Sequence, residues 1–211
     1  GSTTSESKLE VLKNVGISPF QIQLDAHQII GNMEDFLKET NVLVIDIPPG
    51  LRREISSSNE MTFVNKVKTL IPFIEESGIQ KVVFVSSTSV YGDGFPIVEI
   101  TEETQPNPDT ESGKQLVIAE TILQSNSYFK TTVIRFGGLL GDDRHPVKFL
   151  AGRTNVENPD APVNMIQRED CIGVIEKALD FARDDNWEWN QTFNAVAPQH
   201  PTRKAYYHKK A

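Results

Sequence analysis

The sequence has one cysteine, no long hydrophobic run and no leader pattern at its start. Cys171 alone excludes an intrachain disulfide and a multi-cysteine zinc site, which agrees with a reducing compartment. The longest apolar stretches, such as residues 82–85, are far shorter than the roughly 20 residues that span a bilayer. A basic segment followed by an apolar one, which marks a secretory signal, does not open the chain. We therefore expect a cytoplasmic protein that does not insert into a membrane.

Positive charge is scarce as well. The 21 Lys and Arg residues are outnumbered by 29 Asp and Glu residues, which gives a formal net charge of -8. No basic run of about five residues marks a footprint for a phosphate backbone, so a nucleic acid is not an expected partner. With 211 residues, of which 38% are hydrophobic, the chain fits a single globular domain over residues 1–211.

Short β-branched runs alternate with amphipathic stretches along the whole chain, which is typical of βα units around a parallel sheet. The runs predict strands over residues 20–24, 42–47, 81–87, 131–136 and 192–196. The amphipathic stretches predict helices over residues 5–14, 33–39, 59–77, 110–126 and 168–183, with a short helix after Pro201. Ser5 is the expected N-cap of the first helix. Right-handed crossovers between five strands predict an α/β, Rossmann-like doubly wound sheet.

The carboxyl ends of the predicted strands are the places to look for chemistry, because ligands bind there in open α/β sheets. Three ends stand out: hydroxyl side chains at residues 86–89, a Pro-Pro-Gly turn at 48–50, and the pair Gly137 and Gly138. Paired glycines let a flat ring or a diphosphate approach the backbone closely. Residues 92–109, 142–167 and 197–211 are expected to form small segments on the substrate side.

Five short motifs occur in order along the chain. They are Ser-Ser-Thr-Ser-Val-Tyr-Gly at 86–92, Ser-Gly-Lys at 112–114, Arg-Phe-Gly-Gly at 135–138, Asn-Met-Ile at 164–166 and Phe-Asn-Ala at 193–195. Together they resemble the extended short-chain dehydrogenase/reductases, which include the NAD-dependent epimerases and dehydratases. The resemblance covers nearly all of residues 1–205. Ser-Gly before Lys114 and Arg-His-Pro at 144–146 look closest to an atypical, YeeZ-like branch.

The resemblance implies a nicotinamide dinucleotide, NAD(P), as cofactor. It implies that Thr3 and Thr4 contact the adenosine ribose and that Ile47 and Pro48 lie beside the adenine. It further implies that Ser86 and Ser87 lie near the nicotinamide ribose and that Gly137 and Gly138 lie by the nicotinamide. Threonine at the ribose position favours NADP over NAD, because an acidic side chain there would repel the 2′-phosphate.

The sequence departs from the family at the catalytic pair Tyr-x-x-x-Lys. The tyrosine position is Ser112 and the lysine position is Leu116. An aliphatic hydroxyl has a far higher pKa than the roughly 10 of a phenol, and leucine supplies no charge to lower it. Lys114 is no simple substitute, since two helical positions turn it roughly 160° away. Ser87 matches the Ser/Thr that, in the family, hydrogen-bonds the reacting substrate oxygen.

A second departure concerns the start of the chain. The family opens with a strand and a Gly-x-x-Gly-x-x-Gly turn that holds the pyrophosphate, and no such motif occurs here. Residues 1–4 instead resemble the end of the family's second strand, although Gly1 and Ser2 could equally be left by cloning. We expect a piece of a longer protein that lacks the first βα unit. The two exposed sheet edges should then pair with each other or recruit a neighbouring chain.

Two further side chains near the predicted ligand edge, Tyr91 and His145, each have two interpretations. Tyr91 is a replacement acid or an aromatic plug beneath the following loop. His145, which titrates near neutrality, takes over proton transfer or is a loop histidine beside Pro146. Asp142 and Asp143 crowd one turn with His145 but lack a fourth ligand, so no metal site is expected.

The leading functional hypothesis is an NAD(P)-dependent enzyme that acts by hydride transfer on a small polar metabolite such as a nucleotide-linked sugar. The rival hypothesis is a non-catalytic dinucleotide sensor or scaffold that has lost the Tyr-x-x-x-Lys pair. A homodimer through the helices that start near Asn59 and Thr110 would be typical of the family. Trp187 and Trp189, beside a polar turn, are interface anchors or lids.

Overall fold

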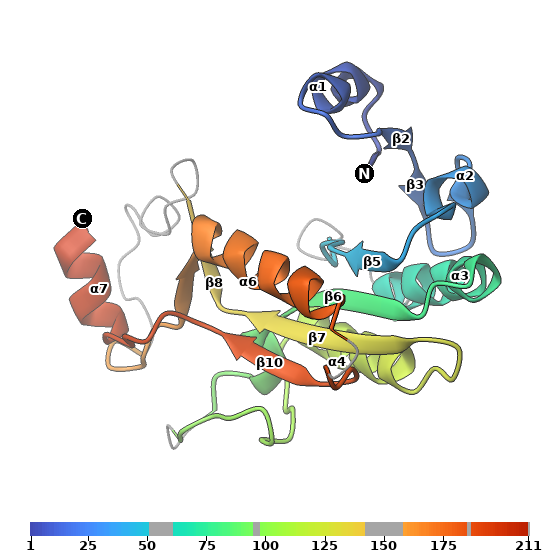
Figure 1. Ribbon diagram of the computed structural model, residues 1–211. Coiled ribbons are helices and arrows are strands. Elements are labelled where there is room, and N and C mark those ends of the chain that lie inside the picture. Colours follow the sequence, from blue (N-terminus) through green and yellow to red (C-terminus); the bar gives the residue numbers. More distant parts are fainter. Residues whose placement is uncertain (51–60, 95–97, 142–157, 185–186, 211) are drawn as a thin grey trace.

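A parallel four-stranded sheet forms the centre of the computed structural model, which describes residues 1–50, 61–94, 98–141, 158–184 and 187–210 (Figure 1). The strand order is β10-β7-β6-β5, and all three pairings are parallel. The strands are β5 (Val42–Ile45), β6 (Lys81–Ser87), β7 (Lys130–Phe136) and β10 (Thr192–Ala195). All four coincide with predicted strands. Strands β5 and β6 read as nearly continuous apolar runs, as buried parallel strands do, whereas β10 at the edge of the sheet has one buried residue.

Helices cover both faces of this sheet (Figure 1). On one face lie α3 (Thr62–Ser77) and α4 (Glu111–Gln124), and on the other lies α6 (Arg168–Phe181). The side chain of Thr110 caps α4 by accepting a hydrogen bond from the backbone of Gly113. Gly78 ends α3 with a φ of 75°, a left-handed conformation that glycine adopts without strain. A last helix, α7 (Arg203–Lys210), follows Pro201 as predicted.

The N-terminal region forms small sheets of its own. Strand β1 (Ser2–Thr3) pairs in parallel with β2 (Phe20–Gln21), and β3 (Gln23–Leu24) pairs antiparallel with β4 (Ile29–Ile30). Between and after them lie the 3-10 helix η1 (Glu6–Lys8), α1 (Leu9–Asn14) and α2 (Met33–Leu37). Ser5 provides no side-chain cap; its Oγ is instead 2.9 Å from the Oγ of Ser7.

The single strand expected over residues 20–24, as fifth member of one sheet, was therefore wrong. The backbone amide of Asp25 donates to the carbonyl of Gln28 and closes a turn, which folds the chain back on itself. Residues on the two sides of Ile22 consequently pair with different neighbours. A propensity pattern does not reveal this division, because both halves have the same alternating character.

A cavity separates β1 and β2 from β5. Its volume is about 480 Å³, and its lining includes Gly1, Ser18 and Phe20 on one side and residues 42–44 of β5 on the other. Among the described residues the two sheet edges do not pair with each other. The absence of a first βα unit stays a prediction.

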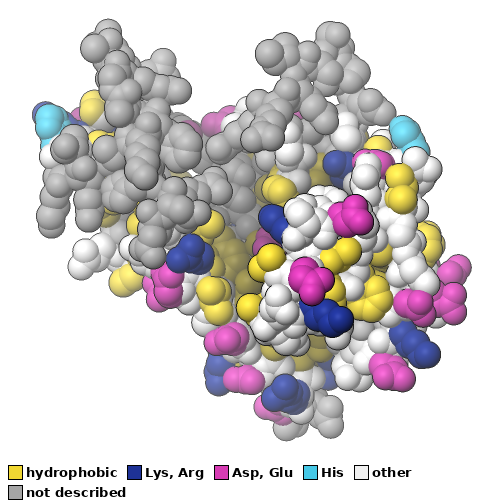
Figure 2. Space-filling view, turned by 90° about the horizontal axis from the view of Figure 1, so that it is seen from above, with side chains coloured by type: hydrophobic (Ala, Val, Ile, Leu, Met, Phe, Trp, Pro, Cys, Tyr) yellow, Lys and Arg dark blue, Asp and Glu magenta, His cyan; other side chains and the backbone are white. Residues whose placement is uncertain are grey.

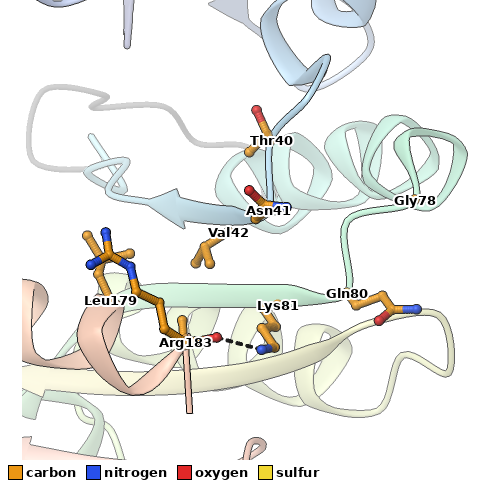
Figure 3. A pocket seen from close by; sticks show the side chains of 9 residues that line it. Thr40, Asn41, Val42, Gly78, Gln80, Lys81, Leu179 and Arg183 are labelled. Atoms are coloured by element: carbon orange, nitrogen blue, oxygen red, sulfur yellow. Dashed lines mark hydrogen bonds between the residues drawn. The ribbon is translucent and has the colours of Figure 1, made fainter. Parts of the chain in front are cut away.

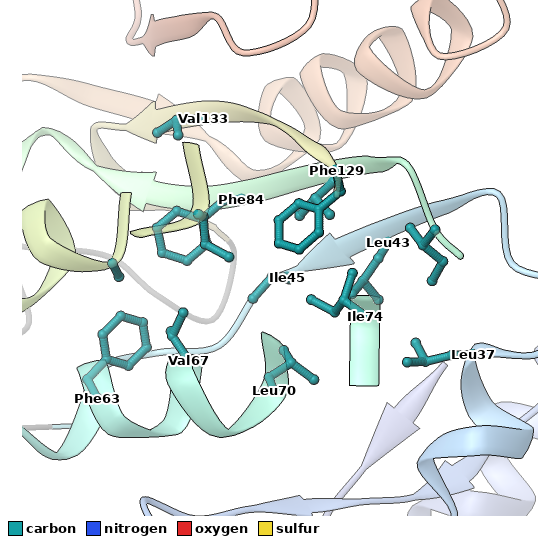
Figure 4. Close-up of a cluster of buried hydrophobic side chains, with 14 of the residues drawn as sticks. Leu37, Leu43, Ile45, Phe63, Val67, Leu70, Ile74, Phe84, Phe129 and Val133 are labelled. Carbon is teal, nitrogen blue, oxygen red and sulfur yellow. The ribbon is translucent and has the colours of Figure 1, made fainter. Parts of the chain in front are cut away.

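The main core lies between the sheet and the helices α3 and α4 (Figure 4). Phe84 of β6 is fully buried and stacks on Phe63 of α3 with ring centroids 6.5 Å apart. A smaller cluster on the other face includes Ile134 and Cys171. Of the helices in the described ranges, none is long and apolar enough to cross a bilayer.

Truncation of the buried ring of Phe84 to alanine should lower the free energy of unfolding by about 3–5 kcal/mol, because it leaves a cavity in a packed core. The matched control is Tyr128→Ala, just before β7, whose ring is 67% exposed and should contribute about 1 kcal/mol or less. Denaturant unfolding of both variants measures the difference. Equal losses would contradict the assigned core.

Candidate functional site

A cavity of about 520 Å³ lies at the carboxyl edge of the central sheet. It is bounded by the ends of β6 and β10, by residues 98–100 and by the segment before β9 (Met165–Gln167). Its lining residues that carry hydrogen-bonding or ionisable side chains are Thr88, Tyr91, Glu99, Asn164, Asn194 and His200. Polar groups converging in a cavity at this edge are typical of a ligand site in an α/β fold.

A network of buried polar side chains lies beneath this cavity. Arg135 of β7 donates from Nη2 and Nε to the two carboxylate oxygens of Glu120 on α4, at 2.6 and 3.1 Å. Its Nη1 donates to the hydroxyl of Tyr91 at 2.6 Å. That hydroxyl lies 2.9 Å from Oδ1 of Asn194 and can donate to it. Ser86 of β6 donates to Glu120 at 2.6 Å, so five elements of the fold meet in one network.

Burial and charge act in opposite directions on Arg135. Burial alone would lower the pKa of its guanidinium, but the hydrogen bonds to Glu120 and Tyr91 and the charge of Glu120 outweigh it and raise the pKa. The guanidinium therefore stays charged. It lies 5.0 Å from the centre of the Tyr91 ring, which holds the phenol toward the cavity.

Ser86 and Ser87 point their hydroxyls to different places. Ser86 is 5% exposed and bonded to Glu120 within the core. Ser87 is half-buried, and its Oγ accepts a hydrogen bond from the backbone of Ser89, which caps the 3-10 helix η2 (Thr88–Tyr91). This contact uses a lone pair of the Ser87 hydroxyl. No hydrogen bond within the described part of the chain uses its proton, which is therefore available to a ligand.

A close backbone approach fixes η2 against α4. A Cβ on Gly113 would lie 2.6 Å from the carbonyl oxygen of Ser89, so no other residue fits there without displacement. Ser112 and Leu116 lie on this same helix. Leu116 is buried at 3% exposure in the main core.

The structure gives Gly137 and Gly138 a packing role. A Cβ on Gly137 would lie 2.8 Å from the carbonyl oxygen of Asn164, and one on Gly138 would lie 2.7 Å from the sulfur of Met165. The amide of Gly138 donates to that same carbonyl, where β8 (Gly138–Leu140) begins its parallel pairing with β9. The absence of side chains at these glycines allows the segment before β9, which lines the cavity, to pack closely.

The other predicted cofactor contacts lie at the ends of β1 and β5. Thr3 is half-buried, and its Oγ1 accepts a hydrogen bond from the amide of Ser5. Thr4 is exposed. Ile47 packs against the core and Pro48 is exposed. No described contact joins these four residues to the cavity at β6 and β10.

One histidine of the site was missed from the sequence. His145, with Asp142 and Asp143, lies outside the described residues. His200 lines the cavity instead, although it follows the last strand by five residues. Like Tyr91, His200 follows the carboxyl end of a parallel strand, and this position could have indicated it as a site residue.

Two other features do not offer comparable chemistry. Burial, together with the charge of Asp170, raises the pKa of the Cys171 thiol, so it stays protonated and poorly nucleophilic. A cavity of about 620 Å³ lies at the amino ends of β5 and β6 (Figure 3). There the ammonium group of Lys81 donates to the carbonyl of Ala182, just past the end of α6, at 2.5 Å, which satisfies a helix end.

The surface seen in Figure 2 carries interspersed charges. Lys and Arg side chains on this face alternate with Asp and Glu, and hydrophobic side chains show in its middle. No single basic patch is formed there by the described residues.

Replacement of Glu120 by glutamine should lower the free energy of unfolding by about 3–5 kcal/mol, because the buried charge of Arg135 loses its partner. The double variant Glu120→Gln/Arg135→Met should regain much of this loss, since it removes both charges. Thermal and denaturant unfolding measure both. A double variant no more stable than Glu120→Gln would show that the pair is not energetically coupled.

Comparison with known proteins agrees with this architecture. A model of the NAD-dependent epimerase/dehydratase family matches residues 13–155. Protein YeeZ of Escherichia coli strain K12 is 31% identical over 208 residues, which cover 98% of this chain and 72% of YeeZ. These two matches confirm the resemblance drawn from the motifs, including that to the YeeZ-like branch.

Solved structures match at lower identity. UDP-glucose 4-epimerase of Thermotoga maritima, solved with UDP-glucose, superposes with a TM-score of 0.65 at 16% identity, over 83% of this chain and 62% of the epimerase. MoeE5 in complex with UDP-glucose and NAD superposes with a TM-score of 0.68 at 16% identity, over 97% of this chain and 77% of MoeE5. The chain thus spans less than two thirds of the epimerase, and at these identities the likeness concerns the fold, which is Rossmann-like as predicted. On the family match and the identity to YeeZ, the chain belongs to the NAD-dependent epimerase/dehydratase family.

Proposed function

We propose that this protein binds a nicotinamide dinucleotide and acts by hydride transfer on a nucleotide-linked sugar or a similar polar metabolite. The observation that carries the proposal is the cavity at the carboxyl edge, with Tyr91 and Asn194 fixed by the charged Arg135 below. Family membership supports the cofactor, and UDP-glucose and NAD bound to MoeE5 support the substrate class.

The residues at the strand ends fit the two ends of such a cofactor. Hydroxyl side chains stand at the ends of β1 and β6, at Thr3 and Ser87, where a ribose can approach. When bound, the nicotinamide would supply or accept the hydride. The sequence offers no Gly-x-x-Gly-x-x-Gly turn for the pyrophosphate, so we expect these 211 residues alone to bind NAD(P) weakly. Thr3 and Thr4 favour NADP.

In this proposal the hydroxyl of Ser87 donates a hydrogen bond to the reacting oxygen of the substrate, and the proton released with the hydride passes to another group. Tyr91 forms a fixed wall of the cavity, because its hydroxyl receives a hydrogen bond from Arg135 and directs its one proton to Asn194 or to the carbonyl of Thr101. His200, which lines the cavity, and His145, which lies outside the described residues, are the candidates for proton exchange with solvent, because an imidazole can both accept and donate a proton. The active site is atypical: Ser112 replaces the family's tyrosine and Leu116 its lysine.

A second candidate function rests on Leu116. Its side chain is part of the hydrophobic core, so the position that carries the family's lysine contributes packing and no charge. This favours a dinucleotide sensor or scaffold in which the fold persists without turnover. Both functions require cofactor binding. Only the enzyme requires the hydroxyl of Ser87 as a hydrogen-bond donor to a reacting substrate oxygen.

Ser87→Ala in the full natural protein should lower turnover at least about tenfold while leaving the Kd for the cofactor within about twofold, because the hydroxyl acts on the reacting oxygen. UDP-glucose with NAD+ or NADP+ is the first substrate pair to use, with nicotinamide absorbance as the readout. Thr121→Val, which removes an exposed hydroxyl on α4, is the matched control.

Three outcomes separate the candidates. Loss of turnover with retained binding supports the enzyme, and binding without turnover in the natural protein supports the sensor. No binding of either cofactor would contradict both. His145→Ala and His200→Ala, measured in the same assay, show which histidine exchanges protons, since only that variant should slow turnover.

We also propose a homodimer that buries the exposed faces of α3 and α4, the two helices that pack side by side. Phe73, 37% exposed on α3, is an apolar contact available to a second copy. Phe73→Glu should convert a dimer to a monomer in sedimentation velocity, with Lys114→Glu on α4 as the control for charge. A monomeric natural protein would contradict the proposal.

A further inference from the structure

A second cavity at the central sheet lies on the opposite face from the buried Arg135 network. Its volume is about 570 Å³, within the range of about 300–1,000 Å³ that small ligands occupy. It opens between α6 and the strands β7 and β10. It shares Asn194 and Val196 with the candidate site, but the rest of its lining is separate.

The floor of this cavity contains a buried hydroxyl without a protein partner. Alternate residues of a strand point to opposite faces of the sheet. The hydroxyl of Thr131 donates a hydrogen bond to the backbone carbonyl of Leu123, at the face that α4 covers. Thr132 therefore points to the α6 face, where it lines the cavity and is 1% exposed. Its Oγ1 has no hydrogen-bond partner among the described residues, which is unfavourable unless a bound molecule supplies one.

One wall of the cavity is aromatic. The rings of Phe181 and Trp187 stack with centroids 4.1 Å apart and planes 4° apart. Phe193 of β10 lies 5.8 Å from Trp187 at 25°. Aromatic rings prefer stacked or edge-to-face neighbours, so this wall favours a planar aromatic body over a sugar or a phosphate. The aliphatic side chains of Ile134, Ile166 and Val174 complete an apolar lining.

Opposite charges lie at the two ends of the cavity rim. The ammonium group of Lys177 lies 4.8 Å above the ring of Phe181, beside the aromatic wall. Asp170 lies seven residues earlier on α6, roughly 10 Å away by the helical rise of 1.5 Å per residue. A carboxylate is attracted at the Lys177 end and repelled at the Asp170 end.

We propose that this cavity binds a planar aromatic carboxylate whose ring also carries a hydroxyl or a carbonyl group. The ring packs on the wall formed by Phe181, Trp187 and Phe193, the carboxylate faces Lys177, and the ring substituent bonds to Thr132. The sequence left open whether Trp187 is an anchor or a lid, and here it forms the wall of a site. The site is independent of the proposed dehydrogenase function.

Isothermal titration calorimetry of the full natural protein tests this site with two probes, 6-hydroxynaphthalene-2-carboxylate and naphthalene-2-carboxylate. Both should bind at one saturable site, which UDP-glucose and NAD+ do not block. Thr132→Val should weaken binding of the hydroxylated probe about fivefold and leave the other unchanged, because only the former can bond to the hydroxyl. Lys177→Gln should weaken both about fivefold, whereas Lys114→Gln on α4 should weaken neither.

The melting temperature of Thr132→Val provides an independent readout. Removal of a buried hydroxyl without a partner should keep or raise it, so a variant that melts lower would show that the hydroxyl is bonded within the protein and would overturn the proposal. Absence of saturable binding, or equal weakening of both probes by Thr132→Val, would also overturn it. So would a dimer that Phe193→Glu dissociates, since a second copy would then cover the cavity.

Discussion

The bidentate ion pair between Arg135 and Glu120 is the constraint on which the candidate site depends. It joins the central strand β7 to α4, and through Ser86 and Tyr91 it also holds the end of β6. A buried charge pair of this kind is costly to desolvate and more costly to break by removing one partner. Its role is therefore better explained by the side chains that it positions than by a net gain in folding stability. It sets the phenol of Tyr91 and the amide of Asn194 at the carboxyl edge of the sheet.

Much of the fold could be predicted from the sequence, for a physical reason. Strands β6 and β7 are mostly buried on both faces, and β5 alternates buried with half-buried residues, so apolar residues dominate these strands, whereas β10 at the sheet edge has one buried residue. Helices α3, α4 and α6 each bury one stripe, which gives the three- and four-residue spacing. The N-terminal strands could not be predicted as well. They are two residues long and are defined by a turn rather than by a hydrophobic run, so residues 20–24 were assigned to the wrong sheet.

The site was only partly predictable. Strand-end hydroxyls and the position of Tyr91 follow from topology, because the carboxyl ends of parallel strands meet at one edge. The buried pair did not follow, since Glu120 and Arg135 are 15 residues apart and each resembles an ordinary polar residue in its own element. The signal that existed was an arginine inside an apolar strand, which requires an anionic partner. The glycines after β7 were assigned to a ligand, and the structure gives them a packing partner at Asn164 and Met165.

The fold and the family are thus established, and cofactor binding at this site is the central claim of the proposed function. Calorimetric titration of the full natural protein with NADP+ and NAD+ tests that claim most directly. We expect saturable binding of one molecule per chain, tighter for NADP+ because threonines stand where an aspartate would repel the 2′-phosphate. Absence of binding by either dinucleotide would contradict the account.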